Sequence, residues 1–84
     1  MLTVSVISPE ATLFTGDAES VVAPAFDGEV GILTGHAPMI TALGRGTLKV
    51  NGSGGEQNFT VDGGFLQVVD NQVRVVTERA EKQR

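Results

Sequence analysis

Apolar and polar residues alternate with a period of two along much of the chain, which is the spacing of half-buried β-strands. The alternation is clearest at residues 47–51, where Leu48 and Val50 are predicted to point inward, and around Phe59 and Val61. Together with short apolar runs, this pattern predicts strands over residues 2–6, 19–25, 29–33, 39–43, 47–51, 58–61, 65–69 and 73–77.

Glycine and proline separate these segments. The 84-residue chain holds 11 Gly and 3 Pro, and up to Gly64 they recur so often that a helix of about 11–12 residues does not fit between them. Pro24 falls inside a predicted strand and suggests an edge position or a bulge there. The pattern therefore predicts an all-β fold, a sandwich or barrel of short strands.

The last residues of the chain break the alternation. Residues 78–84 read Glu-Arg-Ala-Glu-Lys-Gln-Arg, which are good helix formers but too few for a stable isolated helix. We expect one β-sandwich domain over residues 1–77 and a short polar C-terminal tail over residues 78–84.

Composition and charge narrow the choice of partners. The net charge is −4, with four Phe and no Trp or Tyr, so the chain is a poor candidate for binding nucleic acid or anionic lipid. The longest apolar stretch covers residues 21–26, far short of the roughly 20 residues of a membrane span. We expect no insertion into a bilayer, and no signal peptide is visible at the start.

Catalytic motifs are scarce. His36 is the only histidine and there is no cysteine, so a hydrolytic triad is not supported and a zinc site is not expected. The glycine clusters at residues 44–46 and 52–55 lack the residues of nucleotide-binding loops and are better explained as turns. We predict no cofactor.

Two alternative functions stay open at this point. Acidic residues beside glycines could pair as the acid and base of a small carboxylate-based hydrolase, although solvated loops explain them more simply. A free-standing ligand-binding sandwich is the other alternative, and the scarcity of aromatic residues counts against it.

One long segment resembles a known family. Val-Ala-Pro at residues 22–24, followed by Asp-Gly-Glu-Val-Gly-Ile-Leu-Thr-Gly-His-Ala-Pro-Met-Ile-Thr-Ala-Leu at residues 27–43, is similar to the signature of the epsilon subunit of F-type ATP synthases. Ser-Pro-Glu at residues 8–10, Leu-Phe-Thr-Gly at 13–16 and the Gly-Gly-Phe-Leu strand within 61–68 extend the resemblance in the same order.

The resemblance implies a ten-stranded, two-sheet β-sandwich in the central stalk of an ATP synthase. Such a subunit is non-catalytic: it packs against the gamma subunit and the membrane rotor ring and couples proton translocation to ATP synthesis. Its implied location is peripheral, on the cytoplasmic face of a bacterial plasma membrane. Family members usually continue into a helical domain, which would begin within residues 78–84. Because ATP binding in the family uses that domain, we expect no nucleotide binding here.

The same resemblance implies two sets of contact residues. The residues expected to meet the rotor ring are Asp27, Gly28, Glu29 and His36, with His36 on the same rim as Glu29. The residues expected to meet gamma are Ser8, Met39, Ile40 and Thr41. Three of these sites also have a plainer explanation: a solvated acid for Glu29, a loop-stabilising hydrogen bond for His36, and core packing for the apolar run at 39–43.

Overall fold

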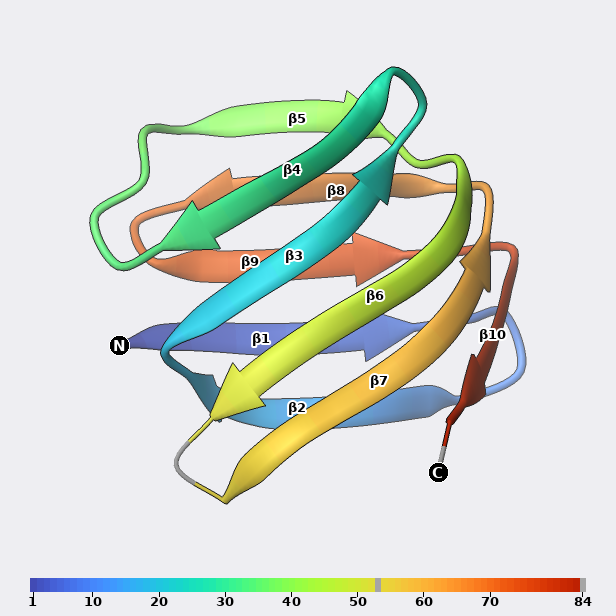
Figure 1. Ribbon diagram of the computed structural model, residues 1–84, viewed down its shortest axis with the longest axis horizontal. Helices are drawn as coiled ribbons and strands as arrows, with labels where there is room; N and C mark the ends of the chain where they lie inside the picture. The colour runs from blue at the N-terminus through green and yellow to red at the C-terminus, as the bar shows by residue number, and fades with distance from the viewer. Residues whose placement is uncertain (53, 84) are drawn as a thin grey trace.

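Ten strands form two five-stranded sheets that pack face to face in a computed structural model, which describes residues 1–52 and 54–83 (Figure 1). The first sheet has the strand order β2-β1-β9-β8-β5 and the second β10-β7-β6-β3-β4. The predicted all-β, two-sheet sandwich of about ten strands is confirmed. The strands are β1 (Leu2–Ile7), β2 (Thr12–Ala18), β3 (Ser20–Ala25), β4 (Gly28–Leu33), β5 (Met39–Ala42), β6 (Arg45–Gly52), β7 (Gly55–Asp62), β8 (Phe65–Val69), β9 (Gln72–Val76) and β10 (Arg79–Lys82).

The core follows from the alternation in the sequence. Leu48 and Val50 on β6 and Phe59 and Val61 on β7 are 0–1% exposed, as predicted, and their polar neighbours face outward. Phe59 meets the ring of Phe14 from the edge, with centroids 6.1 Å apart. In the first sheet, β1 pairs in parallel with β9, which places its buried side chains beside those of β9.

Strand β2 was not predicted, because its burial pattern gives almost no signal. It lies at the edge of the first sheet, and of its seven residues only Ala18 is fully buried. Antiparallel backbone pairing holds this strand to β1, and its neighbouring residues Leu13 and Phe14 both pack against the core, so no period of two is visible in the sequence.

The predicted boundary at residue 77 is wrong, because the sandwich continues into β10. This strand pairs with β7 from Arg79 opposite Asp62 to Lys82 opposite Phe59. Beyond it, the Gln83 amide N–H donates to the Asn58 carbonyl oxygen (2.7 Å). An edge strand with mostly exposed side chains carries no hydrophobic alternation, so residues 78–84 read as a tail in the sequence.

Pro24 does not mark an edge, since β3 lies between β6 and β4. The pairing of β3 with β6 covers only Ser20–Val22 and stops before the proline. The Pro24 carbonyl oxygen accepts a hydrogen bond from the Gly44 amide (2.8 Å), on the side away from β4. Because the nitrogen and the carbonyl of one strand residue point to the same side, the nitrogen of Pro24 also faces away from β4. The missing N–H therefore removes no hydrogen bond from the β3–β4 ladder.

Two connections that cross between the sheets lie side by side. Gly63 and Gly64 lead from β7 to β8, and Thr77 and Glu78 lead from β9 to β10. The Thr77 side chain is buried, and its Oγ1 lies 2.9 Å from the Gly63 carbonyl oxygen. The Leu43 amide donates to the Gly64 carbonyl oxygen (2.9 Å). These bonds fasten both crossings and the β5–β6 corner to one another.

Candidate interaction surfaces

The outward side of the first sheet carries a set of apolar side chains, which we call the apolar face. The inward positions of β8 are Leu66 and Val68, so the alternate positions point to solvent. The strand register aligns one row of paired residues across four neighbouring strands: Ala42, Phe65, Val76 and Ile7. The apolar face consists of Ile7, Ile40, Ala42, Phe65, Val69 and Val76.

These side chains are more exposed than packing within one domain requires. Ile40 is 67% exposed, Val69 42% and Phe65 40%. Between them, Gln67 on β8 stands opposite Arg74 on β9. Two shallow depressions of about 330 and 270 Å³ border Arg74. The outward side of this sheet therefore combines the apolar face with polar side chains and one arginine, and aromatic and arginine side chains are enriched in protein–protein interfaces.

The structure brings only part of the predicted gamma set to this face. Ile40 points outward, whereas Met39 and Thr41 alternate with it and are half-buried, and Met39 packs against the core. Ser8 lies in the β1–β2 turn, where its backbone and hydroxyl both bond to Ala11. The turn follows β1, and β9 and β8 separate β1 from β5. Core packing, the plainer explanation, holds for Met39.

The predicted rotor-ring set is divided between two ends of β4. Asp27 lies in the β3–β4 turn and Glu29 at the start of β4, both exposed, and Gly28 has a φ of 131°. His36 lies in the loop after the end of β4 (Figure 1). A six-residue strand is roughly 16–20 Å long. The expectation that His36 shares a rim with Glu29 is therefore wrong, because an extended strand places its two flanking loops at opposite ends of the sheet.

His36 is held by local contacts. Its half-buried ring has Nδ1 2.7 Å from the carbonyl oxygen of Ala37, and its amide donates to the Leu33 carbonyl oxygen (3.1 Å). The contact between the His36 ring and the Ala37 carbonyl oxygen is the loop-stabilising hydrogen bond that the plainer explanation of His36 predicts. One residue earlier, the Gly35 amide donates to Asn71 Oδ1 (2.7 Å), a contact that the sequence did not reveal.

The β3–β4 turn is fixed to the β5–β6 corner. The Phe26 amide donates to the Ala42 carbonyl oxygen (3.1 Å), and Ala25 forms a bridge with Leu43. The Phe26 side chain is nevertheless 71% exposed, beside Asp27. Sequence reasoning missed this residue, although an aromatic side chain in a short polar turn is itself a signal. The turn is thus an anchored, acidic tip that presents one aromatic ring.

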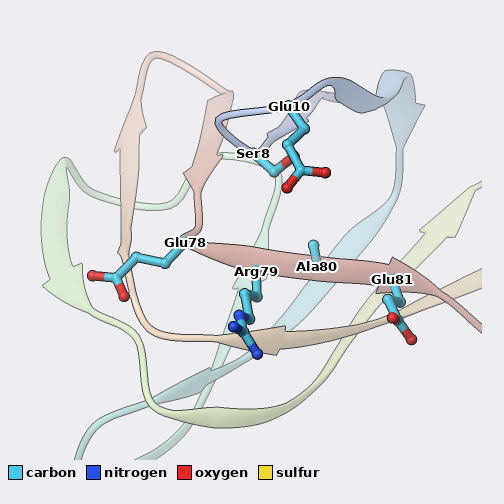
Figure 2. Close-up of a pocket in the computed structure, with 6 residues that line it drawn as sticks. All are labelled: Ser8, Glu10, Glu78, Arg79, Ala80 and Glu81. Atoms are coloured by element: carbon cyan, nitrogen blue, oxygen red, sulfur yellow. The ribbon is translucent and has the colours of Figure 1, made fainter.

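The hydrolase alternative gains no support from the carboxylates around the pocket in Figure 2. This pocket of about 290 Å³ lies between the β1–β2 turn and β10 and is lined by Ser8, Glu10, Glu78, Arg79, Ala80 and Glu81. Figure 2 shows Glu78 and Glu81 near the two ends of β10, with carboxylates that point away from each other. They do not face Glu10 as an acid–base pair.

Two further findings concern the described part of the chain, residues 1–52 and 54–83. It contains no group of three or more His, Cys, Asp or Glu side chains that could hold a metal ion. It also contains no helix long and apolar enough to cross a membrane.

The fold is that of a small two-sheet β-sandwich domain, and comparison with known proteins places it in a family. Residues 1–83 match the family described as ATP synthase, delta/epsilon chain, beta-sandwich domain. The chain belongs to this family. It is 44% identical over 81 residues to the ATP synthase epsilon chain of a Synechococcus strain, covering 96% of this chain and 59% of that relative.

Other relatives agree. The ATP synthase epsilon chain of Leptospira borgpetersenii is 44% identical over 77 residues, which cover 92% of this chain and 61% of the relative. A chain in the cryo-EM structure of the Euglena gracilis mitochondrial ATP synthase, in an assembly that includes the c-ring, superposes with a TM-score of 0.88. It is 24% identical, and the match covers 96% of this chain and 52% of that chain. The present chain thus spans about three-fifths of the length of these curated relatives.

Proposed function

We propose that this chain acts as a non-catalytic central-stalk subunit of an F-type ATP synthase, joining gamma to the membrane rotor ring. In this role it couples proton translocation to ATP synthesis as part of the rotor, at the cytoplasmic face of a bacterial plasma membrane. Support comes from the family match over residues 1–83 and from relatives that are named ATP synthase epsilon chains.

The observation that carries the proposal is the apolar face. Ile40, Phe65 and Val69 are exposed together on one side of a sheet, and exposed apolar residues that cluster in this way mark protein–protein contact sites. We assign this face to gamma. The loop with His36 joins directly to β5, and we assign it to the gamma side as well, in place of the rotor ring.

The acidic tip is the proposed rotor-ring contact. It presents Asp27 and Glu29 to solvent, and its backbone is fixed to the β5–β6 corner. Torque transmission requires a rigid body that two partners hold at the same time. The bonds between the tip, the corner and β8 provide a stiff path between the two proposed contacts.

Binding of the purified chain to gamma, measured by calorimetry, tests the proposal. Ile40→Asp introduces a charge at a position that is already two-thirds exposed, so the fold should persist. We expect affinity for gamma to fall at least tenfold, because the carboxylate would be desolvated without a partner.

The control on the other sheet is Val22→Asp, at a half-buried position of a central strand, so its melting temperature is measured beside that of Ile40→Asp. Val22 lies on the outward side of β3 in the other sheet, since its neighbours Val21 and Ala23 are buried. This variant should bind gamma normally. Equal binding by Ile40→Asp and the unmodified chain would refute the assignment of the apolar face to gamma.

A further inference from the structure

The loop over residues 34–38 carries the chain from β4 in the second sheet to β5 in the first. Two of its hydrogen bonds are local: the His36 amide to the Leu33 carbonyl oxygen, and the His36 ring with the Ala37 carbonyl oxygen. The third joins the Gly35 amide to Asn71 Oδ1 at 2.7 Å. Among the hydrogen bonds of this loop within residues 1–52 and 54–83, it is the one that reaches a segment distant in the sequence.

Asn71 is fixed on its own side of this contact. It lies in the β8–β9 turn with a φ of 62°, and the preceding Asp70 has a φ of 49°. Its carbonyl oxygen accepts the amide of Thr3 (2.8 Å), which attaches the turn to β1. The carboxamide that accepts the Gly35 amide is therefore carried by a backbone held between β8, β9 and β1.

We infer that Asn71 is a positioning residue, which holds the loop over residues 34–38 in the conformation that gamma binds. The inference rests on the proposed function. The loop leads into β5 just before Ile40, and Val69 precedes the β8–β9 turn, so the hydrogen bond closes the end of the apolar face between β5 and β8. A loop that is already ordered loses less conformational entropy when a partner binds.

The left-handed backbone at position 71 offers a selective test. Asparagine and glycine both tolerate this conformation, so Asn71→Gly keeps the turn and removes only the acceptor. Asn71→Asp keeps an oxygen acceptor at the same place. Asp70→Gly is the matched control, because it places glycine at the preceding position of the same turn, where φ is also positive (49°). The Asp70 carboxylate has no hydrogen bond to the rest of the described chain.

Three measurements on each variant decide the question: the dissociation constant for gamma, the melting temperature, and the exchange rate of the Gly35 amide hydrogen by NMR. For Asn71→Gly we expect faster exchange at Gly35 and gamma binding weaker by about two- to tenfold, the factor that corresponds to one hydrogen bond. Asn71→Asp should restore both properties, and Asp70→Gly should change neither. The melting temperature of Asn71→Gly should fall by roughly 2–10 °C, as expected for the loss of one hydrogen bond, and the other two variants should melt within a few degrees of the unmodified chain.

Several results would overturn the inference. Normal gamma affinity in Asn71→Gly would show that the order of the loop does not matter for binding. An equal loss of affinity in Asp70→Gly, or no recovery in Asn71→Asp, would assign the effect to the turn rather than to the hydrogen bond. If the unmodified chain itself fails to bind gamma, the proposed function falls, and with it the role of Asn71 in binding.

Discussion

Replacing Gly64 by alanine should unfold this domain at ordinary temperatures or nearly so. Gly64 has a φ of 102°, a conformation that side-chain-bearing residues rarely adopt. A Cβ at this position would overlap the carbonyl oxygen of Val76, and it would lie 2.6 Å from the Cα of Thr77. These atoms belong to the backbone of the neighbouring sheet crossing and have no rotamer to change.

The magnitude follows from two contributions. Forcing alanine into this backbone region costs about 1–3 kcal/mol. Displacing the packed backbone around Val76 and Thr77 costs roughly another 1–3 kcal/mol. A combined loss of about 2–6 kcal/mol corresponds to a decrease of roughly 10–45 °C in melting temperature for a domain of this size.

Thermal melts of three glycine-to-alanine variants test the reasoning. Gly31 lies in β4 with open space around a Cβ and no positive φ, so Gly31→Ala should be neutral or slightly stabilising. Gly63 has a φ of 77°, but a Cβ there would meet only the flexible side chain of Glu78. The decrease in melting temperature for Gly63→Ala should therefore lie between those of the other two variants. A Gly64→Ala variant that melts within a few degrees of the unmodified chain would refute the account of this corner.

Substitutions at two more positions have definite expected outcomes. Thr77→Val should lower the free energy of unfolding by about 1–3 kcal/mol, because it removes the buried hydroxyl whose single O–H lies within hydrogen-bond distance of the carbonyl oxygens of both Gly63 and Arg79. An unchanged midpoint in urea would contradict this. Glu29→Lys should impair ATP synthesis in membrane vesicles more than Glu29→Gln, since it reverses the charge of the proposed rotor-ring contact. The free energy of unfolding of both variants should stay within about 0.5 kcal/mol of that of the unmodified domain. Normal coupling with Glu29→Lys would make this residue an ordinary solvated acid.

The sequence by itself determined the fold class and most of the strands. A side chain that is buried on one face of a strand leaves a period of two in the sequence, and Leu48, Val50, Phe59 and Val61 show it clearly. The spacing of glycine and proline excluded long helices up to Gly64, because a helix of typical length does not fit between two such residues. The family signature at residues 22–43 also lies within one continuous segment, so it could be read directly.

The tertiary structure decided what depends on pairing between distant segments. Edge strands β2 and β10 bury few side chains and are held largely by backbone pairing, which does not depend on side-chain type and leaves no alternation in the sequence. The separation of Glu29 from His36 follows from β4 being extended between them. The contact between Asn71 and Gly35 joins residues 36 positions apart, and it exists only because the two sheets bring the β8–β9 turn beside the β4–β5 loop.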